Sequence, residues 1–308
     1  MRILVTGVSG YVGASLVPRL QRDGHELRGF ARSAERVAAA GVQLDDLVLG
    51  NAVTGAGLAE ALHGVDAAYY LMHSMEGAAG AAFPEQERRA AEAFAAAARA
   101  ARVRRIVYLG GLMPADRRAS RHLASREAVE VALLGAVPEG IALRASIVIG
   151  ARSRSFRFLV RLIERLPVLA LPAWRTNRTA PIDGRDVLEF LARAATVQAD
   201  LTGRSWDVAG PEVVTYEELI VRIADAMLVE RPRVSLGVTM TPIAAVVAAA
   251  VAGEDPALIT PLMEGLESDL VPRDGSAPGA FGVRLHGLDA AVERALREWE
   301  QIEEVAAR

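Results

Sequence analysis

The sequence predicts an α/β fold, in which a doubly wound parallel sheet carries helices on both faces and a small carboxyl-terminal region follows. Two observations lead to this prediction. Apolar runs typical of strands alternate with helix-like segments through the first half of the chain, and a glycine-rich turn joins the first strand to the first helix. Such alternation is typical of parallel sheets, because each crossover helix lets the next strand run in the same direction.

The first half of the chain contains the clearest elements. Ile3–Val5 is a short apolar strand, and the helix that follows at 12–20 is indicated by apolar residues at helical spacing. Further strands are expected at 25–30, 44–49, 66–72, 104–109 and 141–149. The helices between them are expected at 34–40, 58–62, 83–101 and 120–134.

Beyond Gly150 the alternation loosens. A helix is expected at 152–166, followed by a proline-containing loop in which Trp174 either lines a lid or packs as a plug. Later elements are a helix at 187–195, a strand at 205–208, a helix capped by Thr215 with Glu218 as the reciprocal residue, and a last helix at 288–307. We therefore expect a dinucleotide-binding domain at 1–150, and a mixed segment at 151–308 that completes the sheet and forms the substrate or lid region.

Three glycines, Gly7, Gly10 and Gly13, lie where the first strand turns into the first helix. Free amide groups and the positive end of a helix dipole at such a turn can hold a pyrophosphate. The spacing Gly-x-x-Gly-x-x-Gly departs from the commoner dinucleotide fingerprint. A tight turn without a ligand is the alternative, but the second strand at the expected distance favours a Rossmann-type cofactor loop.

The residues after the second strand predict the type of cofactor. An acidic residue there would bind a ribose 2′-hydroxyl, whereas an arginine accommodates the 2′-phosphate of NADP. This chain has Arg32, Ser33 and Arg36 at that place and no carboxylate at the end of the strand. We therefore expect NADP(H), with NAD(H) as the alternative, unless both arginines are simply solvated residues of a first helical turn.

Composition excludes several classes of chemistry. The chain contains no cysteine, so disulfides and thiol catalysis are excluded, and no lysine, which excludes Schiff-base chemistry and a Tyr-x-x-x-Lys proton relay. A formal net charge of −3 gives no electrostatic argument for nucleic acid. His25, His63 and His286 have no matching ligands at metal-site spacing, and we expect no metal site.

The sequence also bears on location. The first strand begins at the initiating methionine, from which we expect no leader peptide and a cytoplasmic protein. The most hydrophobic stretch, Ile243–Ala252, is shorter than a bilayer requires, so we expect a buried or lid helix and no membrane span.

Several motifs together resemble the atypical and extended short-chain dehydrogenase/reductase superfamily, and within it the NAD(P)H-binding proteins akin to NmrA and to the 39-kilodalton subunit of complex I. The resemblance covers nearly the whole chain. The segments that carry it are Thr6–Gly13, Tyr70–Met75, Arg105–Leu112, Leu143–Gly150, Pro181–Val187 and Val208–Leu219.

This resemblance implies roles for individual residues. The pyrophosphate would lie against Gly7, Ser9, Gly10, Tyr11, Val12 and Gly13, and the adenosine phosphate against Arg32, Ser33 and Arg36. Asn51 and Ala52 would meet the adenine, with Asn51 in place of the usual aspartate. Leu71, Met72 and His73 would line the centre of the cofactor, and Ala145, Ser146 and Ile147 would approach the nicotinamide.

The catalytic positions depart from the superfamily pattern. The end of strand five usually supplies a serine or threonine, and the following helix a Tyr-x-x-x-Lys in which the lysine lowers the pKa of the tyrosine. Here strand five ends in Gly110–Gly111, while His122 and Arg126 occupy the places of tyrosine and lysine. Arg126 could hold the nicotinamide ribose but cannot act as an acid near neutral pH.

Two histidines are therefore the catalytic candidates. His122 would exchange a proton through an imidazole of pKa near 6.5, unless it is an ordinary surface histidine. His73 follows strand four, at the carboxyl end of the sheet where ligands of open α/β folds bind, and either lines the cleft or transfers a proton. Core packing is expected for at least one of Tyr69 and Tyr70, which alternate in a strand, and for Tyr108 of strand five.

The substrate is expected to be a small molecule. Arg144, Arg152, Arg154 and Arg157 form a cationic run that either attracts an anionic substrate or is a solvated helix face. The leading hypothesis is an NADP(H)-dependent oxidoreductase. The alternatives are a non-catalytic NADP(H) sensor or structural subunit, and a redox-neutral isomerase or epimerase that retains its cofactor.

Overall fold

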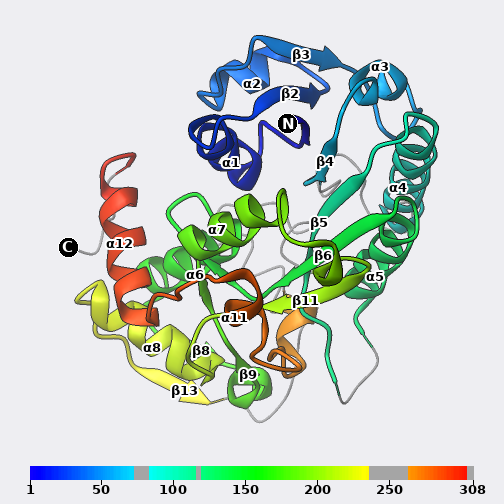
Figure 1. Ribbon diagram of the computed structural model, residues 1–308. Helices are drawn as coiled ribbons and strands as arrows, with labels where there is room; N and C mark the ends of the chain where they lie inside the picture. The colour runs from blue at the N-terminus through cyan, green and yellow to red at the C-terminus, as the bar shows by residue number, and fades with distance from the viewer. Residues whose placement is uncertain (73–82, 116–118, 236–262, 304–308) are drawn as a thin grey trace.

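A computed structural model describes residues 1–72, 83–115, 119–235 and 263–303. Its centre is a seven-stranded, wholly parallel sheet in the order β11-β6-β5-β4-β1-β2-β3, which confirms the predicted doubly wound α/β class (Figure 1). The strands are β1 (Arg2–Thr6), β2 (Glu26–Ala31), β3 (Asp46–Leu49), β4 (Ala67–Tyr70), β5 (Arg105–Gly111), β6 (Glu139–Ala145) and β11 (Arg204–Val208).

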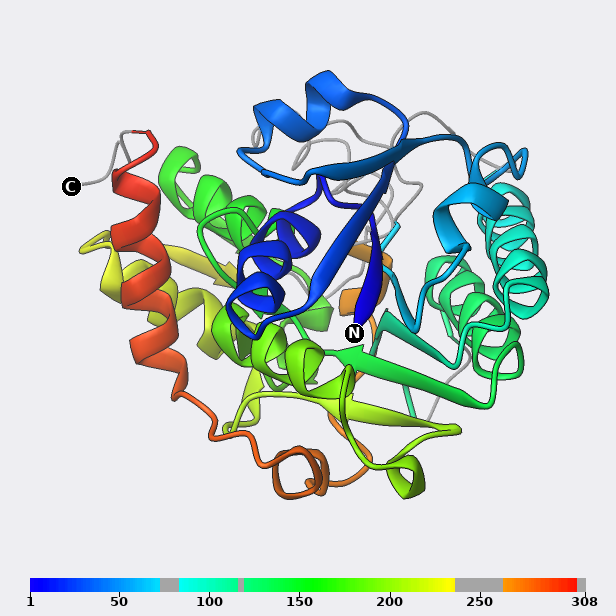
Figure 2. The same cartoon turned by 45° about the horizontal axis from the view of Figure 1, so that its top comes forward.

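Helices cover both faces of this sheet. Successive residues of a strand point to opposite faces, so each strand contributes side chains to two cores. In β1, Ile3 and Val5 join one core, with α1 (Tyr11–Arg22), α2 (Ala34–Ala39) and α7 (Gly184–Ala194), whereas Leu4 joins the other. That second core contains α3 (Leu58–Leu62), α4 (Phe83–Ala100) and α5 (Arg121–Leu134). In both views α4 and α5 lie together on the side of the molecule away from the carboxyl-terminal helix (Figures 1 and 2).

The carboxyl-terminal region has a core of its own around Phe156, Tyr216 and Trp299. Its helices are α6 (Arg154–Arg165), α8 (Tyr216–Ala226) and α12 (Leu288–Glu300), and a short pair, β8 (Leu169–Leu171) with β13 (Arg233–Ser235), closes one side. The shorter elements are η2 (Ala173–Thr176), β9 (Arg178–Thr179), η3 (Ala199–Leu201), β12 (Val214–Thr215) and α11 (Ala277–Phe281).

The expected strand at 141–149 is wrong as a single element. It divides into β6 and β7 (Val148–Ile149), because β6 pairs with β5 and β11 only as far as Ala145. β7 pairs instead with β10 (Ile182–Asp183) in a separate two-stranded sheet. The chain therefore leaves the main sheet at Ser146, and the loop that results faces the candidate site.

Other boundaries agree closely with the sequence. The helix at 58–62 and the Thr215–Glu218 capping box are confirmed, the latter by reciprocal bonds of 2.7 and 3.1 Å. The helix expected at 187 starts at Gly184, because the Asp183 side chain accepts from the amide of Arg185 and caps it. The expected helix at 243–252 and residue His73 lie outside the described residues.

Trp174 and the three tyrosines are core residues. Trp174 packs edge-on against Tyr216 and acts as a plug, while Tyr69, Tyr70 and Tyr108 are buried as expected. In the described part of the chain, no helix combines the length and apolar character that crossing a membrane requires.

Candidate functional site

A cavity of about 560 Å³ lies at the carboxyl ends of the central strands. This is the position at which open α/β sheets bind ligands. Every site residue expected from the sequence, apart from the undescribed His73, lines it: Gly7, Ser9, Gly10, Tyr11, Val12, Gly13, Arg32, Ser33, Arg36, Asn51, Ala52, Leu71, Met72, His122, Arg126, Ala145, Ser146 and Ile147.

The glycine loop fits a pyrophosphate. Gly7 has φ of +66°, and a Cβ there would lie 2.6 Å from the carbonyl oxygen of Leu71; a Cβ at Gly13 would overlap the Gly7 carbonyl. These two glycines serve the turn itself. Gly10 is different, since it is exposed to the cavity and is the N-cap of α1, whose first turn contains no acidic residue. The positive end of the helix dipole and its free amides thus open onto the cavity.

At one end of the cavity lies Arg32, an exposed side chain that forms no ion pair with any residue in the described ranges. Ser33 caps α2 by accepting from the amide of Arg36 at 3.2 Å. The Ser33 hydroxyl also donates to Glu35 at 2.6 Å, and this bond lowers the pKa of the Glu35 carboxyl. An ionised carboxylate therefore lies beside the expected phosphate position, which the sequence analysis missed.

The neighbouring wall suits an adenine. Asn51 Oδ1 accepts from the amide of Val53 at 2.9 Å, so the side-chain nitrogen is left to act as a donor. Phe30, Val53 and Ala90 add apolar surface around Ala52. These three residues were missed by sequence reasoning, although Phe30 could have been found from its place at the end of β2.

At the other end, His122 on α5 lies near Gly110 and Gly111 of β5 in the cavity lining. Burial, assisted by the charge of Arg126, lowers the pKa of His122 to about 4. The expected pKa near 6.5 is therefore wrong for this site. At neutral pH the imidazole is uncharged, so it can donate one N–H bond but carries no ionic proton to deliver.

Arg126 is buried, and its guanidinium contacts a backbone carbonyl, a carboxylate and an aromatic ring. Its guanidinium donates to the carbonyl oxygen of Leu109 at 2.8 Å, lies 3.7 Å from a Glu87 oxygen, and sits over the Tyr108 ring. Ser125 donates to the other Glu87 oxygen at 2.7 Å. Arg126 thus presents a fixed, charge-compensated cation at the cavity wall.

Tyr11 and the loop that follows β6 also line the cavity. Ser146 is 3.3 Å from the Thr179 hydroxyl, and the carbonyl of Ala145 accepts from Leu112. The Tyr11 hydroxyl packs against Gly150 and Gly184 so closely that a Cβ at either position would overlap it. Burial raises the pKa of Tyr11 to about 12, so it stays a neutral donor.

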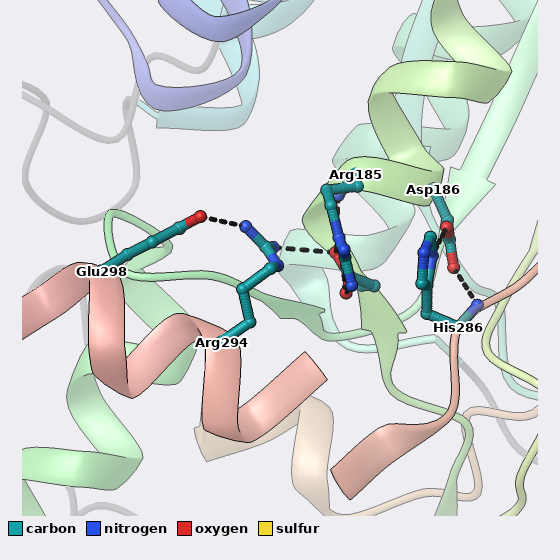
Figure 3. A network of polar contacts seen from close by, with 6 residues as sticks. Arg185, Asp186, His286, Arg294 and Glu298 are labelled. Carbon is teal, nitrogen blue, oxygen red and sulfur yellow. Dashed lines mark hydrogen bonds and ion pairs between the residues drawn. The ribbon is translucent and has the colours of Figure 1, made fainter. Parts of the chain in front are cut away.

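A polar network ties the last helix to α7 beside this region (Figure 3). Asp183 accepts from Arg185 and from Arg294 of α12 at 2.7 and 2.8 Å, and Arg294 also pairs with Glu298. His286 contacts Asp186 through its ring, at 2.6 Å, and its backbone amide. These contacts engage His286 in structure; among the residues that the structure describes, no group of three His, Cys, Asp or Glu side chains could hold a metal ion.

The cationic run expected from the sequence does not act as a unit. Arg144 is buried and forms a two-pronged pair with Glu130, both bonds being 2.8 Å. Arg157 pairs with Glu303 and stacks on Trp299. Only Arg152 and Arg154 of the four line the cavity.

Comparison with known proteins defines the class. Residues 7–134 match the family model described as NAD(P)H-binding. Over nearly its whole length the chain has the same fold as a solved UDP-glucuronic acid 4-epimerase and a solved short-chain dehydrogenase/reductase superfamily protein.

Particular relatives agree with this class. The chain is 29% identical over 114 residues to the mitochondrial NADH dehydrogenase [ubiquinone] 1 alpha subcomplex subunit 9 of Arabidopsis thaliana; this match covers 37% of the chain and spans only 28% of the relative's length. The UDP-glucuronic acid 4-epimerase of Bacillus cereus, solved with UDP-glucuronic acid and NAD, has a TM-score of 0.74 at 13% identity, covering 98% of this chain and 100% of that one. A superfamily protein from Agrobacterium tumefaciens with bound NAD has a TM-score of 0.70 at 19% identity, covering 98% of each chain.

Proposed function

We propose that this chain is an NADP(H)-dependent oxidoreductase that transfers hydride between the nicotinamide and a small organic substrate, without the usual Ser/Tyr/Lys set. The observation that supports this best is the cavity at the carboxyl ends of the central strands. Its lining joins the glycine loop and Arg32 to His122 and Arg126, so a dinucleotide held by the loop would reach the two candidate catalytic side chains.

The preference for NADP(H) rests on Arg32. Its exposed guanidinium has no partner in the described ranges, and a phosphate there would gain a charge-assisted hydrogen bond without breaking an existing ion pair. The Glu35 carboxylate opposes this preference. NAD(H), which the solved relatives bind, is therefore the competing cofactor.

The chain's own residues have distinct parts in this proposal. When bound, the nicotinamide supplies or accepts the hydride. The neutral imidazole of His122 donates its N–H to a substrate oxygen, as an electrophile rather than as an ionic acid. Arg126, fixed by Leu109 and Glu87, holds the nicotinamide ribose, and His73 is the second candidate for proton transfer.

Two alternatives have specific support. A non-catalytic NADP(H)-binding sensor or structural subunit is favoured by Gly110–Gly111, which put no hydroxyl at the end of β5, and by the similarity to a complex I subunit. A redox-neutral epimerase or isomerase is favoured by the likeness in fold to epimerases solved with NAD.

Cofactor choice is tested by titrating NADPH and NADH against the protein and its Arg32→Ala variant. We expect NADPH affinity to fall about tenfold to a hundredfold while NADH affinity hardly changes, since only NADPH carries the 2′-phosphate that Arg32 would contact. Arg22→Ala, which removes an exposed arginine from the end of α1, is the matched control. If Arg32→Ala changes the affinities for NADPH and NADH by the same factor, the proposed preference for NADPH is wrong.

Turnover and retention of the cofactor separate the three functions. An oxidoreductase oxidises NADPH in the presence of a carbonyl compound from a substrate panel, and His122→Ala lowers that rate. An epimerase keeps its cofactor through gel filtration and shows no net oxidation. Exchangeable binding without turnover on any compound would favour the sensor or subunit instead.

A further inference from the structure

The amino end of α6 forms a part of the cavity lining that the expected cofactor residues do not include. Arg152, Ser153, Arg154 and Ser155 line the cavity there, immediately after β7. The cofactor loop, the Arg32 region and the Asn51 region belong to other elements. This segment adds polar and charged side chains to the cavity that the expected cofactor residues do not include.

Ser153 is the residue of this segment whose hydroxyl no described residue engages. It is the N-cap residue of α6 and only 6% exposed, yet its side chain does not cap the helix and bonds to nothing else within the described ranges. Serine at an N-cap normally accepts from the first-turn amides. Here the hydroxyl is left available at the cavity wall, while the first-turn amides have no acceptor within the helix.

The charges around this helix end point to an anion. The first turn contains no acidic residue, and Arg152 and Arg154 flank the N-cap. Cations near the positive end of a helix dipole are unfavourable unless an anion compensates them. Arg152 forms no ion pair with a described residue, so its charge is not compensated there by the protein.

We propose that the amino end of α6 is an anion subsite, in which Ser153 and Arg152 hold a carboxylate or phosphate group of the substrate. The link to a substrate rests on the proposed function, whereas anion binding at α6 does not.

Inorganic phosphate and acetate, titrated calorimetrically into the NADPH-saturated protein, test the proposal and show which anion is preferred. Ser153→Ala and Arg152→Ala should each weaken binding of the preferred anion about tenfold, since one removes a hydrogen bond and the other a charge-assisted contact. Arg99→Ala, an exposed arginine at the end of α4, should leave the affinity unchanged.

Ser153→Asp gives a second and independent outcome. A carboxylate built into the N-cap should raise the melting temperature, because it compensates the helix end, and should abolish anion binding, because it occupies the subsite. A purely structural role of Ser153 predicts a change in stability without loss of anion binding.

Several outcomes overturn the proposal. One is that neither phosphate nor acetate binds, and another is that Ser153→Ala and Arg152→Ala leave anion binding unaffected. A third is that the two variants weaken only NADPH binding, which would assign these residues to the cofactor. If NADPH itself fails to bind, the proposed function fails, and the same titrations on the protein without cofactor still decide whether α6 binds an anion.

Discussion

Arg32 and Arg126 line the same cavity and differ in almost everything else. Arg32 is exposed and makes no ion pair among the described residues, whereas Arg126 is buried against Leu109, Glu87 and the Tyr108 ring. A solvated cation can bind an incoming phosphate at little cost. A buried cation that is already paired with a carboxylate cannot be removed without leaving that carboxylate uncompensated, so it contributes mainly to the stability of the fold around the cavity.

The contrast between Arg32 and Arg126 parallels a contrast between the cofactor-binding end of the cavity and the end where a reaction would occur. The Arg32 end contains features that a dinucleotide needs, and the family match supports binding directly. The Arg126 end contains a neutral imidazole, a fixed guanidinium and two glycines, which suit electrophilic assistance but not the usual proton relay. Cofactor binding is thus better supported than any reaction.

The largest expected effect is on stability. Arg126→Met should lower the free energy of unfolding by about 3 kcal/mol or more, because it leaves the buried Glu87 carboxylate without its compensating charge. The same substitution at exposed Arg32 should change stability by less than about 0.5 kcal/mol. Urea denaturation of the two variants measures the contrast, and equal losses would contradict it.

Adding Glu87→Gln to Arg126→Met sharpens this comparison. Removing the stranded charge should restore part of the lost stability. If the double variant is no more stable than Arg126→Met alone, the loss comes from packing rather than from the ion pair.

The next effect is a pH dependence due to His122. Its pKa is about 4 in the folded protein and near 6.5 when unfolded, so the unfolded state binds the extra proton between these values. Stability should therefore fall as pH drops from 6.5 to 4, by up to about 3 kcal/mol, since one pKa unit corresponds to about 1.4 kcal/mol. His122→Gln should flatten that part of the profile, and an unchanged slope would show that His122 is not the group responsible.

The smallest effect concerns Glu35. Its carboxylate lies beside the region that Arg32 would use for a phosphate, and the exposed charge should weaken NADPH only slightly. Glu35→Gln should improve the ratio of NADPH to NADH affinity about two- to threefold. A ratio that falls would mean that Glu35 supports the binding of NADPH.

Local patterns predicted most of the fold. The apolar strands, the glycine turn at Gly7–Gly13 and the capping box at Thr215 each depend on neighbouring residues, and the structure has them where expected. The division of 141–149 into two strands was not predictable, because it is caused by the pairing of β7 with the distant β10.

The same limit applies to the site. Most cavity-lining residues could be named because the resemblance to a known superfamily assigns them, but the states of individual side chains depend on distant partners. The low pKa of His122 requires burial that only the folded chain provides, and the charge of Arg144 is compensated by Glu130 of another element. The sequence analysis did not single out Ser153, because only the structure shows that this residue begins α6 without making a cap bond.

A crystal structure of the protein soaked with NADPH tests the central claim most directly. We predict that the pyrophosphate lies at Gly10, the 2′-phosphate contacts Arg32, and the nicotinamide lies beside His122 and Arg126, with space left toward Ser153. A cofactor bound with its 2′-phosphate away from Arg32, or with its nicotinamide far from His122, would contradict the assignment of the two ends of the cavity.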